Sequence, residues 1–146
     1  MKLLSKTSIY GIQAALYVAS LKNKRKYVPI RQISQDLKIS FHFLTKILQV
    51  LTQHNIMTSY RGPNGGVTLA RPPSEITLMD MVAAIESPDF FSGCIMELPG
   101  CGERNPCPLH DYWGPMRNDL KSIFENTNLA ELSARIIRNN LRISHG

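Results

Sequence analysis

The sequence predicts a mainly α-helical fold with a small β-hairpin, namely a winged helix-turn-helix followed by a long C-terminal dimerisation helix. Three observations lead to this prediction. Two short helical patterns are joined by a tight turn, two strand-like stretches with a glycine-rich tip follow them, and a one-sided apolar pattern marks the last part of the chain. The 146 residues suffice for one compact domain with an appendage and are few for two independent cores.

The first helix is predicted to begin after Ser5 or Thr7, either of which can cap it. Its apolar positions recur at helical spacing at Ile9, Ile12, Leu16 and Ala19. The basic stretch 22–26 ends this pattern and is predicted to be a solvated loop. The apolar segment 9–21 is too short to cross a bilayer and carries no convincing cleavage motif, so a soluble, cytoplasmic protein without membrane contact is expected.

Two further helices form the predicted helix-turn-helix. Pro29 opens the second helix, which places Ile30, Ile33 and Leu37 on one face. Ile39 and Ser40 form the turn, and Ser40 is placed to cap the third helix. The buried stripe of the third helix is predicted to be Phe43, Leu44, Ile47, Leu48 and Leu51. Its outward face then carries His42, Thr45, Lys46, Gln49 and Gln53.

A β-hairpin is predicted after the third helix. Its strands are the stretches 56–60 and 67–70, separated by the glycine-rich tip 61–66. Thr77 and Asp80 then resemble a capping box at the start of a fourth helix. The apolar residues of this helix are Leu78, Met81, Val82 and Ile85. A hairpin directly after a helix-turn-helix is the arrangement of a winged helix.

The rest of the chain divides into a loop and two helices. From 87 to 108 the periodicity disappears and Pro, Gly and Cys accumulate, which indicates a functional loop, here called the cysteine loop. An apolar stripe follows, consisting of Leu109, Tyr112, Trp113, Met116, Leu120, Ile123 and Phe124. Pro115 predicts a helix start or a kink near positions 114–115. A last helix is predicted from about Asn128, with Leu129, Leu132, Ile136 and Ile137 on one face.

We therefore expect a winged-helix DNA-binding domain over 1–86, a cysteine-rich sensor loop over 87–108, and the dimerisation helix with a C-terminal helix over 109–146. The apolar stripe of the long helix could pack on the winged helix, which is the usual fate of such stripes. Because the first four helices already supply a core, pairing with a second copy of the chain is favoured.

The charge balance favours double-stranded DNA as a partner. The chain carries 17 Lys and Arg against 11 Asp and Glu, a net charge of +6, and basic side chains bind phosphates. The predicted DNA-binding residues are Ser40, His42, Thr45, Lys46, Gln49, Arg61, Asn64, Gly65 and Gly66. Those on the third helix can donate to base edges or phosphates, and a thin glycine-rich tip lets Arg61 approach a minor groove. If these were only ordinary exposed residues, the basic charge, the helix-turn-helix spacing and the arginine at the hairpin tip would each need a separate explanation.

Five motifs along the chain carry a family resemblance. They are Leu3-Leu4-Ser5-Lys6, Ile39-Ser40, Arg61-Gly62-Pro63-Asn64-Gly65-Gly66-Val67, Ala70-Arg71-Pro72-Pro73 and Glu75-Ile76-Thr77-Leu78-Met79-Asp80. Together they resemble the IscR/NsrR-like family of bacterial winged-helix transcriptional regulators. The resemblance implies that the third helix enters the major groove, that the wing reaches the minor groove, and that a two-fold homodimer binds. The family usually carries an acidic residue or glutamine near Thr45 and Lys46, so the operator of a relative cannot be transferred.

Three cysteines and a histidine lie close together in the sequence: Cys94, Cys101, Cys107 and His110. Three thiolates and an imidazole suit either zinc or an iron-sulfur cluster. Structural zinc sites usually have a closely spaced ligand pair at each end, and this segment has only the pair Cys107 and His110. An odd cysteine count without an export signal makes a disulfide framework the poorer interpretation.

The family resemblance favours the iron-sulfur cluster. Cluster-sensing members carry three cysteines about five residues apart, and one subgroup adds a histidine two residues after the third. The segment 108–113 matches that subgroup in its histidine and tryptophan, although the first cysteine interval is one residue longer here. Another subgroup takes a carboxylate from the first helix, where this chain has Ile9. The resemblance thus implies a 2Fe-2S cluster on Cys94, Cys101, Cys107 and His110, with 4Fe-4S or zinc as alternatives.

Two other functions are compatible with the residues. One is a metal-free thiol-redox regulator, and the other is a small iron-sulfur carrier or electron-transfer protein that docks an acidic partner. Neither a substrate-pocket signature nor a nucleophile with a base is evident, so an enzyme is not expected, nor is a small-molecule substrate. The cysteine loop lies between the winged helix and the long helix, so gain or loss of a cluster is expected to shift the DNA-reading heads.

Overall fold

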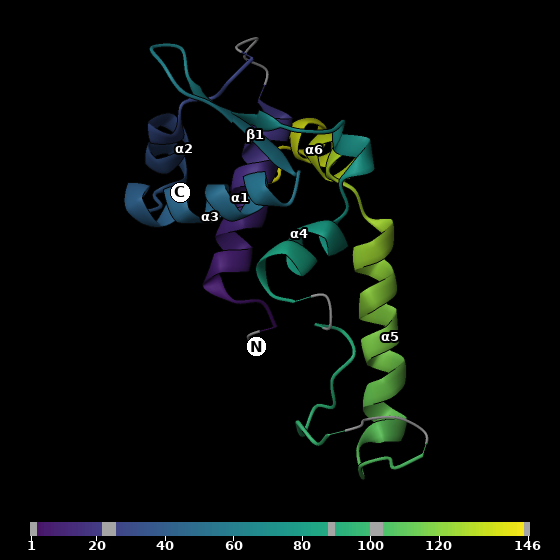
Figure 1. Ribbon diagram of the computed structural model, residues 1–146. Coiled ribbons are helices and arrows are strands. Elements are labelled where there is room, and N and C mark those ends of the chain that lie inside the picture. Colours follow the sequence, from purple (N-terminus) through teal and green to yellow (C-terminus); the bar gives the residue numbers. More distant parts are fainter. Residues whose placement is uncertain (1–2, 22–25, 88–89, 100–103, 145–146) are drawn as a thin grey trace.

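The computed structural model describes residues 3–21, 26–87, 90–99 and 104–144 (Figure 1). In chain order its elements are α1 (Lys6–Ser20), α2 (Ile30–Leu37), α3 (Phe41–Gln53), β1 (Met57–Tyr60), β2 (Gly66–Leu69), the 3-10 helix η1 (Pro73–Glu75), α4 (Leu78–Ile85), α5 (His110–Asn126) and α6 (Leu129–Asn139). All of them except α5 form a head, and α5 runs down from the head, with the described parts of the cysteine loop beside it and below it (Figure 1). The mainly α-helical winged-helix prediction is confirmed.

Helix α1 lies at the centre of the head and contacts α3, α4 and α6. Ser5 caps it, since its hydroxyl accepts the backbone N–H of Ser8 at 3.2 Å. Close packing is possible because small residues face the neighbouring helices; a Cβ at Gly11 would lie 2.6 Å from Cδ1 of Ile85. Ile9, expected on the apolar face, is instead exposed. The buried residues of α1 are Leu16, which the apolar spacing predicted, and Tyr17, together with the small residues Ser8, Gly11, Ala14 and Ala15, which an apolar periodicity underweights.

The helix-turn-helix follows the sequence prediction closely. Pro29 precedes α2, and Ser40 caps α3 by accepting the backbone N–H of Phe43. The turn closes when the backbone N–H of Ile39 donates to the carbonyl of Ser34 at 3.1 Å. Four residues of the predicted stripe on α3 are buried: Leu44, Ile47, Leu48 and Leu51.

The hairpin is antiparallel, with Met57 opposite Leu69 and Tyr60 opposite Gly66. It gains a third partner from the segment before α2, because Val28 and Val67 exchange two backbone hydrogen bonds of 2.8 and 2.9 Å. The connection between α1 and α2 is therefore attached to the hairpin that forms the wing.

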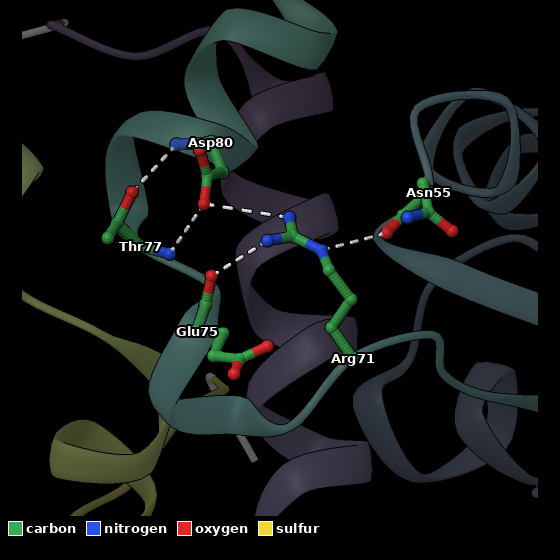
Figure 2. Close-up of polar contacts among 5 residues, drawn as sticks. All are labelled: Asn55, Arg71, Glu75, Thr77 and Asp80. Atoms are coloured by element: carbon green, nitrogen blue, oxygen red, sulfur yellow. Dashed lines mark hydrogen bonds and ion pairs between the residues drawn. The ribbon is translucent and has the colours of Figure 1, made fainter.

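Arg71 joins the end of the hairpin to the start of α4 (Figure 2). Its guanidinium donates to the carbonyls of Asn55 (3.2 Å) and Glu75 (2.8 Å) and lies 3.7 Å from the Asp80 carboxylate. Asp80 also accepts the backbone N–H of Thr77, whose hydroxyl accepts the N–H of Asp80, so the predicted capping box is present. One side chain thus ties the wing to the helix that leads toward the cysteine loop.

Of the two alternatives predicted for positions 114–115, a helix start or a kink, the start is not found. Helix α5 begins at His110 and continues through Pro115 to Asn126. Proline removes only one backbone donor, the one that would reach the carbonyl of Asp111, and side chains on either side anchor the helix, as described below. No helix in the described part of the chain is long and apolar enough to cross a membrane.

The apolar stripe of α5 divides between two environments. Phe124 is buried in a small second core with Val82 and Phe91, and Leu120 packs against it. Met116 and Ile123 are 60% and 56% exposed. On α6, Leu129 is buried as expected, whereas Ile137 is largely exposed. In both helices the predicted apolar face therefore includes residues that the rest of the chain leaves exposed.

Glu86 at the end of α4 holds the N-terminus of α1. Its carboxylate accepts the backbone N–H of Ser5 at 3.1 Å, the hydroxyl of Ser5 at 2.5 Å and that of Ser8 at 2.7 Å. The hydrogen bond from the Ser5 side chain lowers the pKa of Glu86 below its ordinary value of 4.5; partial burial opposes this, and the Ser8 hydroxyl adds to it. The folded protein therefore favours the ionised carboxylate.

A lowered folded-state pKa means that this stabilisation is complete above pH 4.5 and is lost as the pH falls through the folded-state pKa. We predict that Glu86→Gln flattens the acid limb of the curve of unfolding free energy against pH, measured by urea denaturation. Ser8→Ala, which removes one donor, should have a smaller effect of the same sign. An unchanged acid limb in Glu86→Gln would contradict this account.

Candidate DNA-binding surface and cysteine site

The outward face of α3 presents most of the predicted DNA-binding side chains to solvent. Ser40, His42, Lys46 and Gln49 are all exposed. Thr45 is half-buried, and its hydroxyl donates to the carbonyl of Phe41 at 2.8 Å. Thr45 is therefore better placed to accept a hydrogen bond than to donate one.

A groove of about 560 Å³ separates α3 from the hairpin. Four predicted DNA-binding residues line it, Thr45 and Gln49 from α3 and Arg61 and Gly66 from the hairpin. The other lining residues are Ile30, Leu48, Thr52, Gln53, Ser59, Tyr60 and Val67. Polar side chains of α3 and the cationic Arg61 of the hairpin thus lie on opposite sides of a depression between the helix and the wing.

The hairpin tip exposes Arg61 and Asn64, while the glycines beside them are needed by the backbone itself. A Cβ at Gly65 would lie 2.3 Å from the carbonyl oxygen of Tyr60. Gly66 has φ +153°, and a Cβ there would lie 2.1 Å from the carbonyl oxygen of Val28. Both glycines therefore have a structural reason that the sequence pattern did not reveal.

Two cation-aromatic pairs on this surface were missed by sequence reasoning. The Arg31 guanidinium carbon lies 5.0 Å from the ring centroid of Phe41. At the wing, Tyr27 stacks on Tyr60 at 5.3 Å, and the Lys26 Nζ lies 5.7 Å from the Tyr27 ring. The Arg31–Phe41 pair and the stacking of Tyr27 on Tyr60 each join residues from different elements, so helical or strand periodicity gives no signal for them.

In the cysteine loop, Cys94 is buried and Cys107 is half-buried, and their Sγ atoms lie 3.4 Å apart. This separation exceeds the ~2.05 Å of a disulfide bond. It is close to the ~3.8 Å expected for two thiolates on one tetrahedral metal ion with 2.3 Å bonds. Cys101 lies outside the described residues.

His110 is the first residue of α5, and its backbone N–H donates to the carbonyl of Cys107 at 3.0 Å. Its ring lies 3.9 Å from the position that a Cβ on Gly114 would take. Among the residues that the structure describes, no three His, Cys, Asp or Glu side chains come together as a metal site. Of the four predicted ligands, the structure thus places the thiols of Cys94 and Cys107 in contact. A third, His110, is linked to Cys107 by a backbone hydrogen bond.

Helix α5 anchors the segment directly before Cys94. The indole N–H of Trp113 donates to the carbonyl of Gly93 at 3.1 Å. Arg117 donates to the same carbonyl at 3.2 Å and to that of Ser92 at 3.4 Å. The backbone directly before Cys94 is therefore attached to α5 by two side chains.

A family model and a curated relative both match this chain, and both describe transcriptional regulators. The model of the Rrf2 family, described as an iron-dependent transcriptional regulator, matches residues 4–135. The chain is 31% identical over 132 residues to the HTH-type transcriptional regulator IscR of Yersinia pseudotuberculosis, covering 90% of this chain and 79% of that protein.

Two solved structures share the fold. CymR, the global cysteine regulator of B. subtilis, superposes with a TM-score of 0.76 at 24% identity, covering 90% of this chain and 95% of that one. IscR of T. potens superposes with a TM-score of 0.75 at 20% identity, covering 95% of this chain and 91% of that one. Both likenesses support the winged-helix architecture.

Proposed function

The chain belongs to the Rrf2 family of transcriptional regulators, and on this premise we propose that it is a cytoplasmic, homodimeric DNA-binding regulator controlled by a cysteine-ligated iron-sulfur cluster. The observation that carries the sensing part of the proposal is the 3.4 Å contact between the Sγ atoms of Cys94 and Cys107. The DNA-binding part rests on the exposed face of α3 and the groove beside it.

In the proposed complex α3 enters the major groove. His42, Lys46 and Gln49 would contact base edges or phosphates, with Ser40 at the helix N-terminus, where backbone N–H groups favour a phosphate. Arg61 and Asn64 at the hairpin tip would reach the adjacent minor groove, and the groove between α3 and the wing would accommodate the sugar-phosphate backbone between them.

The proposed dimer contact is the exposed face of α5. Tyr112, Met116 and Ile123 are 75%, 60% and 56% exposed and share one face of this helix, because they are spaced by four and seven residues. Such an apolar stripe at the edge of a small domain indicates an interface, and a second copy of the chain is the proposed occupant. Two recognition helices would then read half-sites roughly 34 Å apart.

The proposed ligands of the cluster are Cys94, Cys101, Cys107 and His110. When bound, a 2Fe-2S cluster would supply a redox-active cross-link between the cysteine loop and the start of α5. Trp113 and Arg117 hydrogen-bond the backbone before Cys94 and so attach it to α5. A change in the conformation of the cysteine loop would therefore change the position of the proposed dimer helix. Loss of the cluster would release this cross-link and change how the two heads are held.

Anaerobic reconstitution with iron and sulfide tests the cluster. We predict visible charge-transfer absorbance with iron and sulfide bound in equal amounts, and its loss in Cys107→Ala and Cys101→Ala. His110→Ala should retain a weaker, shifted spectrum if the three thiolates suffice to hold the cluster. Circular dichroism confirms that each variant is folded. A wild-type protein that stays colourless would refute the cluster.

A thiol-redox regulator without metal is the second candidate, and the same sulfur contact favours it. Cys94 and Cys107 could form a disulfide with hydrogen peroxide as oxidant: both thiols lose their protons and two electrons, the S–S bond forms, and the peroxide leaves as two waters. Peroxide treatment of the metal-free protein should then lower its mass by two hydrogens and alter DNA binding. Cys94→Ser would abolish both changes, and their persistence in that variant would refute this candidate.

A further inference from the structure

Phe41 and Arg31 form an exposed pair at the N-terminal end of the recognition helix. Phe41 is the first residue of α3, next to the capping Ser40, and is 43% exposed. Arg31, an exposed residue in the first turn of α2, places its guanidinium carbon 5.0 Å from the centroid of the Phe41 ring. The pair thus joins the two helices of the helix-turn-helix on the side that would face DNA.

The head does not require this ring for its core. Phe43, two residues further, packs on the main core and meets Tyr10 edge to face at 5.7 Å. Phe41 belongs to neither hydrophobic core of the described residues. A large apolar side chain that is exposed to water at a helix N-terminus, yet held by a cation–π contact, is available to contact a partner.

The chemistry of the pair matches the edge of a DNA major groove. Residues in the first turn of a recognition helix contact base edges, and phenylalanine makes apolar contact with the C5-methyl group of thymine. A guanidinium that lies over the face of a ring still has N–H donors at its edge that can bind a phosphate oxygen.

We propose that Phe41 reads the methyl group of a thymine in each half-site, and that Arg31 fixes the ring and binds the neighbouring phosphate. This inference rests on the proposed function, namely that α3 enters the major groove. Phe41 would thus add an apolar specificity-determining residue to the polar face of α3, while Arg31 would contribute affinity through the phosphate.

The test first obtains a binding sequence by selection with the wild-type protein from a randomised 30-bp duplex library. Each enriched thymine is then replaced by deoxyuridine, which lacks only the methyl group. At one position per half-site the wild-type protein should bind roughly fourfold more weakly, the effect of one buried methyl group. Phe41→Ala should bind thymine and uracil duplexes equally. Equal discrimination by wild type and Phe41→Ala, or none by the wild type, would overturn the proposal.

Arg31 is tested by the salt dependence of binding to the selected duplex. Loss of one phosphate contact should reduce the slope of log K against log salt by about one per protomer in Arg31→Ala. Lys121→Ala, which removes a positive charge from exposed α5, is the matched control and should leave the slope unchanged. Equal slopes in Arg31→Ala and the wild type would overturn its phosphate role.

Different results would contradict the DNA-binding function and the proposed role of Phe41. If selection with the wild-type protein enriches no sequence, the DNA-binding function and this inference both fail. If a sequence is enriched but shows no methyl effect, only the role of Phe41 fails. Both side chains are exposed, so unchanged unfolding midpoints are expected and verify that each variant is folded.

Discussion

Glutamate in place of Met116 is expected to convert the protein to a monomer and to weaken operator binding by about 10²–10⁴-fold. Met116 is 60% exposed in the middle of the apolar face of α5. In the proposed dimer two copies of this residue lie near the two-fold axis, where two carboxylates would be desolvated and repel each other. A monomer loses the effective concentration that the second DNA-binding head provides, which sets the size of the effect.

Sedimentation and DNA-binding titrations check this result. The control is Asn118→Glu, which introduces the same charge at an exposed position two residues away on another face of α5. This variant should remain dimeric and bind the operator as the wild type does. A dimeric Met116→Glu protein with wild-type affinity would show that another surface pairs the protomers, or that they do not pair.

Alanine in place of Gly66 is expected to destabilise the head by about 2–4 kcal/mol, from positive-φ strain and overpacking together. The new Cβ would lie 2.1 Å from the Val28 carbonyl oxygen, and φ is +153° at this position. Either the β-bridge between Val28 and Val67 opens or the hairpin shifts. Because the hairpin forms one wall of the groove beside α3, DNA binding should weaken as well.

Urea denaturation measures the change in the free energy of unfolding. Gly93→Ala is the matched control, because a Cβ at Gly93 has no neighbour within 4 Å. Its unfolding free energy should lie within ~0.5 kcal/mol of the wild type. A Gly66→Ala protein as stable as Gly93→Ala would mean that the approach of the Val28 segment to the wing is not required.

Local signals were read correctly from the sequence. Ser40 as the cap of α3 and the capping box of Thr77 and Asp80 are both present, because capping depends on side chains within three residues of one another. The hairpin followed from its glycine-rich tip for the same reason. The winged-helix fold then followed from the order of these elements.

Contacts between elements were not predictable from the same patterns. Ile9 was expected in the core, but α1 is surrounded by other helices and buries several small residues, among them Gly11 and Ala14, beside Leu16 and Tyr17. The cation–π contact of Arg31 with Phe41 depends on residues brought together only by the fold. The same holds for the contacts of Arg71 (Figure 2). Gly66 was explained by access to DNA, whereas its close neighbour is the backbone of Val28 in the segment before α2.

The cysteine site was predictable in composition and only partly in geometry. Spacing and residue type identified the cysteines, and the structure places two of them, Cys94 and Cys107, in contact. The anchoring of the loop by Trp113 and Arg117 had no sequence signal, because both side chains bind backbone carbonyls rather than a recognisable partner residue. These anchors are what connects the proposed sensor to α5.

The most direct test of the account compares operator affinity of the same protein with and without its reconstituted cluster, under anaerobic conditions and at one salt concentration. We expect at least a tenfold difference in affinity, which disappears in Cys107→Ala. Identical affinities of the two forms for the selected duplex would contradict the proposal that the cysteine loop controls DNA binding, even if the cluster assembles.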